Sequence, residues 1–270
     1  MTFNLRRAGT VPLCRIAYYF IFMRISPTML KAEHITKYYE TQKVIEDISI
    51  EIRQGELVCL LGASGIGKTT LFQILSGLEH PDEGAVFLRE EDITGITGKM
   101  SYMQQKDLLL PFETIIDNVS IPLTLKGVPK KAARETARAW FLEFGLDGCE
   151  QKYPAQLSGG MRQRAALLRA YLFSEQVMLL DEPFSALDVI TKTAMQQWFI
   201  EIRSNHGTTA LFITHDVDEA LLLSDRIYIM AGTPGKITYE FALNGENRAD
   251  PAFATSTRFL EYKKQILKQL

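Results

Sequence analysis

The sequence predicts an α/β fold, because short apolar strands alternate along the chain with helical segments. The first such strand spans residues 57–61 and is followed by a glycine-rich turn and then by apolar residues at helical spacing. Two more apolar runs cover residues 177–180 and 211–214. Their alternation with helices favours one open sheet. Such sheets bind ligands beyond the carboxyl ends of their strands, so the residues that follow these strands are the first candidates for a site.

The chain before residue 57 divides into two parts. Residues 1–28 hold several arginines and no acidic residue, with an apolar patch at residues 16–23 that is too short to span a membrane. We expect residues 1–28 to lie outside the fold and the folded domain to occupy residues 29–270. Residues 30–57 are expected to form short strands, since polar and apolar residues largely alternate over residues 46–52. These strands predict an antiparallel β edge.

The glycine-rich turn at residues 62–69 matches the phosphate-loop pattern G-x-x-x-x-G-K-[ST] at every fixed position. Glycines in such a loop let backbone N–H groups turn toward phosphate oxygens, and the following helix adds the partial positive charge of its N-terminus. In this chemistry Lys68 reaches the β- and γ-phosphates and Thr69 ligates Mg²⁺. The alternative is a turn that binds nothing, but the strand before it and the helix after it favour a P-loop NTPase core.

An inserted helical subdomain is expected over residues 106–169. Its clearest helix spans about residues 131–144 and has one apolar face. The expected core residues of that face are Ala133, Ala137, Trp140, Phe141 and Phe144. Further along, Ser158, Gly159 and Gly160 open another helix with a serine cap and small residues. A helix N-terminus of this kind can bind an anion but has no lysine of its own, so it predicts only half of a site.

Two adjacent carboxylates end the apolar run at residues 177–180. Asp181 is expected on the metal side of a site, acting through Mg²⁺ and its water shell, and Glu182 is the candidate general base for a water molecule. A strand that ends in a solvated turn is the alternative, and Pro183 would suit it. His215 follows the strand at residues 211–214 and could be a capping or core histidine.

From about Leu30 to Leu270 the chain resembles the ATP-binding subunits of ABC transporters, and the order of its motifs carries the resemblance. The matching motifs are Walker A at residues 62–69, the signature sequence at 157–161, Walker B at 177–182 and the D-loop at 185–188. His215 resembles the family's switch histidine, Gln105 its Q-loop glutamine and Tyr39 its adenine-stacking aromatic residue. Met161 stands where many relatives carry glutamine, while the Ser-Gly-Gly core of the signature is intact.

The resemblance implies ATP and Mg²⁺ as cofactors and a head-to-tail pair of subunits. ATP held by Lys68 and Thr69 of one chain would be closed over by the signature residues of the other, so hydrolysis would need a dimer. The implied nucleotide-binding residues are Tyr39, Gly62, Ser64, Gly65, Gly67, Lys68, Thr69, Thr70, Ser158, Gly159, Gly160 and Asp188. The implied metal-site residues are Thr69, Gln105 and Asp181, and the implied catalytic residues are Glu182, His215 and Gln105. Gln104 is a rival for Gln105, and Tyr38 is a rival for Tyr39.

Composition and the resemblance together define the expected partners. The 30 basic and 32 acidic residues give a net charge of −2, which does not indicate a nucleic-acid partner. No segment is apolar for long enough to span a membrane. The resemblance therefore implies separate transmembrane permease subunits, a solute-binding protein that acts through them, and a peripheral position at the cytoplasmic face of the membrane.

The expected function is ATP hydrolysis that powers the import of a small solute. Residues 110–119, 181–188 and 233–237 resemble importers of the nitrate, sulfonate and taurine group, and importers of thiamine-precursor pyrimidines share much of this pattern. The main alternative is a soluble ATPase of the same superfamily that acts on nucleic acid or the ribosome, but such relatives usually carry a long coiled coil or a second ATPase copy. A non-catalytic regulatory subunit would be expected to lack Glu182 or His215, and both are present.

Overall fold

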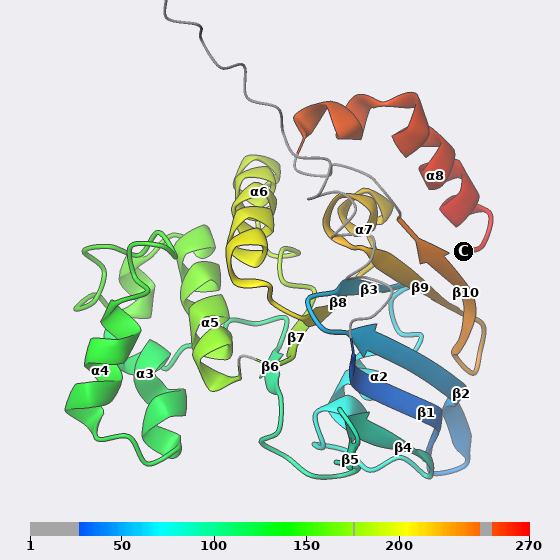
Figure 1. The fold of residues 1–270 in the computed structure, drawn as a ribbon, viewed down its shortest axis with the longest axis horizontal. Helices are drawn as coiled ribbons and strands as arrows, with labels where there is room; N and C mark the ends of the chain where they lie inside the picture. Colours follow the sequence, from blue (N-terminus) through cyan, green and yellow to red (C-terminus); the bar gives the residue numbers. More distant parts are fainter. Residues whose placement is uncertain (1–26, 175, 244–249) are drawn as a thin grey trace, which may run out of the picture.

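A mostly parallel sheet forms the centre of the molecule, as the apolar strands predict (Figure 1). The computed structural model describes residues 27–174, 176–243 and 250–270, and in these residues the sheet has six strands in the order β10-β9-β3-β8-β7-β6. Only β10 is antiparallel to its neighbour. The strands are β3 (Leu57–Gly62), β6 (Ser101–Met103), β7 (Met178–Asp181), β8 (Ala210–Thr214), β9 (Arg226–Ala231) and β10 (Lys236–Ala242).

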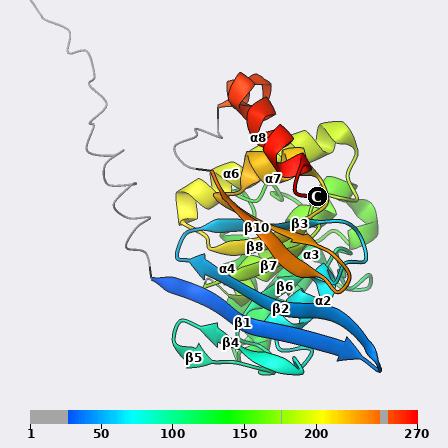
Figure 2. The same ribbon diagram turned by 90° about the vertical axis from the view of Figure 1, so that its right-hand side faces the viewer.

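A second, antiparallel sheet lies along one face of the first (Figure 2). Its strands, in spatial order, are β2 (Gln42–Arg53), β1 (Thr28–Tyr39), β4 (Glu83–Leu88) and β5 (Glu91–Asp92). The predicted antiparallel β edge is confirmed, but β1 and β2 have 12 residues each and are longer than the short strands expected. Register shifts interrupt their pairing. Hydrogen bonds from Glu46 N–H to Gly235 O (3.0 Å) and from Gly235 N–H to Val44 O (2.9 Å) tie this hairpin to the turn before β10.

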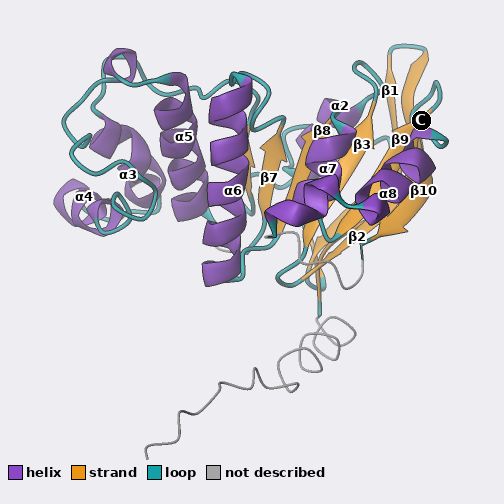
Figure 3. Cartoon of the chain, turned by 90° about the horizontal axis from the view of Figure 1, so that it is seen from above, coloured by secondary structure: helices purple, strands orange, loops and turns teal. Residues whose placement is uncertain are grey.

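Helices lie on both sides of β7, and α6 (Val189–His206) lies on the same side as α5 (Gly159–Phe173) (Figures 1 and 3). The helices α3 (Ile115–Leu125), α4 (Lys130–Arg138) and α5 begin within residues 106–169, where the helical subdomain is expected, and α5 extends past residue 169. The other helices are α2 (Lys68–Leu75), α6 (Val189–His206), α7 (Val217–Leu223) and α8 (Thr257–Leu267), with short 3₁₀ turns at Pro154–Gln156 and Pro251–Thr255. Within the described ranges, none of these helices has the length and apolarity of a membrane span.

One predicted helix differs from the structure in where it ends. The helix predicted over residues 131–144 is wrong in length, because α4 ends at Arg138 and the chain continues in tight turns, with the Phe141 N–H bonded to Arg138 O at 3.1 Å. The predicted burial of Phe141 and Phe144 is nevertheless confirmed.

The prediction that residues 1–28 lie outside the fold falls mostly on residues 1–26, which are outside the described residues. Thr28 already belongs to β1.

Strand β3 is buried on both faces, which fixes the point where the phosphate loop begins. Leu57, Cys59 and Leu61 pack into the core beneath α5, α6 and α7, whereas Val58 and Leu60 pack against α2 and the antiparallel sheet. All five side chains are fully inaccessible. Burying an aliphatic side chain of this size contributes roughly 1.5–3 kcal/mol, so the strand is anchored strongly from both sides.

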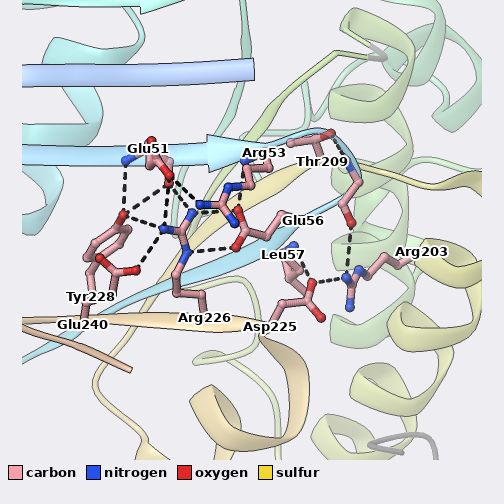
Figure 4. A network of polar contacts seen from close by, with 11 residues as sticks. Glu51, Arg53, Glu56, Leu57, Arg203, Thr209, Asp225, Arg226, Tyr228 and Glu240 are labelled. Atoms are coloured by element: carbon pink, nitrogen blue, oxygen red, sulfur yellow. Dashed lines mark hydrogen bonds and ion pairs between the residues drawn. The ribbon is translucent and has the colours of Figure 1, made fainter. Parts of the chain in front are cut away.

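A buried arginine joins the two sheets at the amino-terminal end of β3 (Figure 4). Arg226, on β9, donates two hydrogen bonds of 2.8 Å to the Glu56 carboxylate, one of 2.7 Å to the backbone oxygen of Glu51 on β2, and one of 3.0 Å to Glu240 on β10. Burial opposes its charge, but the Glu56 carboxylate outweighs this effect and raises the pKa of Arg226. This guanidinium therefore stays charged and holds three strands and the start of β3 in register.

We expect Arg226→Met to lower the free energy of unfolding by about 3–5 kcal/mol, because it leaves the buried Glu56 carboxylate without its cation. Urea denaturation followed by circular dichroism measures this. Arg53→Met is the matched control: it removes a half-exposed guanidinium that pairs with Glu51 at 3.0 Å, and it should cost about 1 kcal/mol or less. Equal losses in the two variants would contradict the structural role given to Arg226.

Candidate functional site

The phosphate loop leaves β3 through glycines that the local packing requires. A Cβ atom on Gly62 would lie 2.5 Å from the carbonyl oxygen of Met230, so only glycine fits at the end of the strand. Gly67 has φ 103° and caps α2 without a side-chain hydrogen bond. The first N–H groups of α2 are therefore not capped by a side chain, and together with the helix dipole they form an anion site. Around Gly65 a Cβ atom would meet nothing within 4 Å, which leaves room beside the loop.

Lys68 is buried at the start of α2 and reaches back along the loop. Its Nζ donates hydrogen bonds to the carbonyl oxygens of Gly62 (2.8 Å) and Ala63 (2.6 Å). Burial lowers the pKa of Lys68, while the nearby Glu182 and Asp181 carboxylates act in the opposite direction. A lysine held between the loop carbonyls and two carboxylates is suited to exchange these contacts for a phosphate group.

A pair of oxygen atoms fits the magnesium ion implied by the phosphate loop. Thr69 Oγ1 donates to Asp181 Oδ2 at 3.1 Å, and this brings the first turn of α2 to the end of β7. Mg²⁺ in phosphate sites usually takes only one or two protein oxygens and completes its shell with water and phosphate. The Thr69 hydroxyl and the Asp181 carboxylate fit this donor requirement.

Asp181 also contacts Tyr102 on β6, a residue to which the sequence assigned no role. The Tyr102 hydroxyl donates to Asp181 Oδ2 at 3.2 Å. Burial, followed by the charge of Asp181, raises the pKa of Tyr102, so the hydroxyl keeps its proton. Burial also raises the pKa of Asp181, and the hydrogen bonds from Thr69 and Tyr102 oppose that rise. In the sequence, Tyr102 is marked only by lying three residues before Gln105. Its contact with Asp181 depends on the pairing of β6 with β7.

The three residues expected to be catalytic lie together. Glu182 Oε2 accepts a hydrogen bond of 3.0 Å from Gln105 Nε2, and Glu182 Oε1 lies 3.0 Å from His215 Nδ1. Gln105 thus contacts Glu182, and its role as the Q-loop glutamine stays a prediction. His215 is 56% exposed at its side chain, and the residue that caps α7 is Asp216. The alternatives of a core or capping histidine therefore do not describe His215.

A backbone turn separates the two carboxylates. Asp181 is the last residue of β7, and Glu182 has φ 46°, a left-handed conformation that is uncommon for residues other than glycine. The Glu182 N–H donates to Ile213 O at 3.1 Å, which fixes the turn against β8. Asp181 is consequently held toward Thr69, while Glu182 is held toward Gln105 and His215.

The other expected nucleotide-binding residues lie in separate places. Ser158 caps α5 and accepts a hydrogen bond from the Met161 N–H at 3.3 Å, and α5 lies apart from α2 (Figures 1 and 3). A Cβ atom on Gly160 would lie 2.8 Å from Thr191 Cγ2, so this glycine also serves packing against α6. Asp188 caps α6, because its side chain accepts hydrogen bonds from the N–H groups of Ile190 and Thr191. The pKa of Asp188 is lowered, chiefly by the hydrogen bond from the Thr191 hydroxyl.

The remaining expected residues lie along the loop and the β1–β2 hairpin. Ser64 is exposed within the loop, and Thr70 is half-buried in the first turn of α2. Tyr39 is 43% exposed at the end of β1, with Lys37 Nζ 5.7 Å from its ring centroid. Tyr38 is half-buried, so Tyr39 is the more exposed of the two residues. Its stacking role stays a prediction.

Comparisons with known proteins agree with this geometry. The family model described as ABC transporter matches residues 45–185. The chain is 48% identical over 197 residues to the formylaminopyrimidine import ATP-binding protein ThiZ of Halalkalibacterium halodurans, covering 73% of this chain and 77% of that protein. It is 38% identical over 238 residues to the aliphatic sulfonates import ATP-binding protein SsuB of Bacillus cereus, covering 88% of this chain and 92% of that protein.

A solved structure extends the similarity to the fold. It is the dimeric, post-hydrolysis state of the ATP-binding cassette MJ0796 bound to ADP and phosphate. It matches with a TM-score of 0.70 at 28% identity, over 81% of this chain and 100% of that one. The P-loop core with an antiparallel sheet and helices is thus the architecture of ATP-binding cassettes.

Tyr102→Phe should raise the Mg²⁺ concentration for half-maximal nucleotide hydrolysis about tenfold, because a hydrogen bond that orients Asp181 is lost. A Mg²⁺ titration of phosphate release, together with Mn²⁺ binding measured by electron paramagnetic resonance, tests this. Tyr228→Phe is the control, because the Tyr228 hydroxyl accepts a hydrogen bond from Arg226 and donates one to the backbone oxygen of Glu51, and neither bond involves Asp181. This variant should leave the Mg²⁺ dependence unchanged. Equal Mg²⁺ dependence in both variants would show that Tyr102 does not orient Asp181.

Proposed function

This chain belongs to the ABC transporter family, and from that membership we propose that it hydrolyses ATP to power the import of a small solute through separate transmembrane subunits. One observation carries the proposal. Lys68 and Thr69 follow β3, Asp181 and Glu182 end β7, and His215 follows β8, so the expected groups meet where neighbouring parallel strands end. This is the arrangement that phosphoryl transfer to water requires.

We assign the chemical roles from these contacts. The phosphate loop and Lys68 would bind the ATP phosphates, and Thr69 and Asp181 would hold Mg²⁺, which would neutralise charge on the phosphates. Glu182 orients the attacking water and takes its proton. Gln105 and His215 contact the two oxygens of Glu182, so they fix the direction of that carboxylate. The exposed ring of His215 would also meet the terminal phosphate, and a part for Gln105 in the metal site is proposed from the family resemblance alone.

A second copy of the chain is proposed to complete the site. Ser158 and Gly159 are exposed at the start of α5 and lie away from the phosphate loop of their own chain (Figure 3). Val189 and Ile190, next to Asp188, are 80% and 83% exposed. Apolar side chains this exposed at the start of a helix support a surface that another protein covers. In a head-to-tail pair, Ser158, Gly159 and Gly160 would close over the ATP held by the partner.

The proposed setting is the cytoplasmic face of a membrane, with permease subunits as partners and a solute-binding protein acting through them. Similarity to importers of formylaminopyrimidine and of aliphatic sulfonates supports a small polar solute of the pyrimidine or sulfonate class. A net charge of −2 gives no support to a nucleic-acid partner. The alternative of a soluble ATPase acting on nucleic acid or the ribosome is therefore not favoured.

Two substitutions separate hydrolysis from binding. Glu182→Gln should lower kcat by about 100-fold or more, because it removes the base, while ATP binding is retained and an ATP-bound dimer accumulates. Lys68→Ala should weaken ATP binding itself, because it removes the cation from the phosphate site. Phosphate release and titration with a fluorescent ATP analogue measure the two effects. Normal turnover by Glu182→Gln would remove Glu182 from the role of base.

Purification from native membranes in a mild detergent tests the transport role. We expect a polytopic membrane protein to copurify and to be identified by mass spectrometry, together with a solute-binding protein encoded or recovered with it. Binding of that protein to a sulfonate or to an aminopyrimidine, measured by calorimetry, would then identify the solute class. Recovery of ribosomal or DNA-associated proteins alone would favour the soluble ATPase instead.

A further inference from the structure

Lys192 lies one turn into α6 and contacts two carboxylates at the start of α7. Its Nζ donates to Asp216 Oδ2 at 2.8 Å and lies 3.5 Å from Glu219 Oε1. It is only 23% exposed at its side chain. Burial opposes its charge, but the hydrogen bonds and negative charges of Asp216 and Glu219 together outweigh that effect, so the pKa of Lys192 is raised. The ammonium group therefore stays charged between α6 and α7.

Glu219 is the buried centre of this contact. It is 4% exposed, and besides Lys192 it is held by Gln196 Nε2 at 2.9 Å and by the hydroxyl of Thr214. Gln196 lies one helical turn beyond Lys192, so α6 presents both donors to the same carboxylate. A buried carboxylate is stable only while it is paired and hydrogen-bonded, so removing Lys192 would leave Glu219 with a charge that its surroundings cannot compensate.

The contacts of Lys192 hold the residues on both sides of His215. Thr214, the last residue of β8, donates its hydroxyl hydrogen to Glu219 and accepts a hydrogen bond of 3.1 Å from the Asp216 N–H. Asp216 Oδ1 accepts from the N–H groups of Asp218 (2.9 Å) and Glu219 (3.3 Å), while its other carboxylate oxygen binds Lys192. The backbone of His215 is thus fixed at both ends, although its ring is exposed and is bonded to Glu182.

We propose that Lys192 is a positioning residue that keeps His215 in reach of Glu182 by tying the loop after β8 to α6. The inference rests on the proposed role of His215 in ATP hydrolysis and adds a residue to it. Because α6 is capped by Asp188 and begins at Val189, on the surface proposed to meet a second copy of the chain, Lys192 also connects that surface to the catalytic histidine. Dimer contacts that shift the start of α6 would change the position of His215.

A double-mutant cycle with His215 tests the proposal in the full-length chain. Lys192→Met should lower kcat about 10- to 100-fold through misplacement of His215, with little change in the affinity for a fluorescent ATP analogue. In the His215→Ala background the same substitution should change kcat by less than about twofold, because the group through which it acts is gone. The separate variant Lys192→Arg, which keeps the cation, should retain most of the activity of the unsubstituted protein.

Two further variants keep the test decisive. Lys263→Met is the control, because Lys263 of α8 also forms an ion pair with α7, at Asp218 (2.6 Å), but not with the residues that flank His215; its kcat should be unchanged. If Lys192→Met does not fold, Asp216→Asn keeps a helix-capping side chain while removing the charge that pairs with Lys192. It should give the same loss of kcat, again only when His215 is present.

If Lys192→Met lowers kcat about 10- to 100-fold in the His215→Ala background as well, the proposal is overturned, since Lys192 would then act independently of His215. Loss of ATP affinity with unchanged kcat would overturn it as well. If His215→Ala alone leaves kcat unchanged, the role assigned to His215 under the proposed function is wrong, and the inference falls with it.

Discussion

The turn at the end of β7 is the constraint on which the rest of the site depends. One peptide unit separates Asp181, buried against Thr69 and Tyr102, from Glu182, whose left-handed backbone sends its carboxylate toward Gln105 and His215. Two chemically similar groups thereby face different surroundings, which suits the proposed roles of Asp181 beside a metal ion and Glu182 beside a water molecule. The burial of β3, β7 and β8 at every residue holds this turn in place against the phosphate loop.

Much of the fold and site could be predicted because the responsible signals are local. The phosphate loop needs glycines at fixed spacing, and Asp181 and Glu182 follow directly from a buried strand. The end of α4 at Arg138 could not be predicted, because an apolar period reports which side chains are buried and not where regular hydrogen bonding stops. Tyr102 and Lys192 were missed because their partners lie 79 and 24 residues away in the sequence. Only the sheet order and helix packing bring such pairs together.

The position of α5, which begins at the signature sequence, favours a pair of chains. The start of α5 has a serine cap and exposed residues Ser158 and Gly159 but no lysine, whereas Lys68 begins α2, which lies apart from α5. We therefore regard each as half of one site that two chains complete. The start of α6, which carries the exposed Val189 and Ile190, is joined through Lys192 to the loop that bears His215. In the proposed account, contacts of a few side chains thus link pairing to hydrolysis.

The central claim is that Asp181 serves the metal, Glu182 serves the water and a second chain closes the site. A crystal structure of the Glu182→Gln variant with ATP and Mn²⁺, with the metal located by its anomalous scattering, tests all three parts at once. Our account predicts Mn²⁺ beside Thr69 and Asp181, residue 182 facing the terminal phosphate, and Ser158 of the partner subunit against that phosphate. A metal bound at residue 182, or a phosphate covered without any second chain, would contradict it.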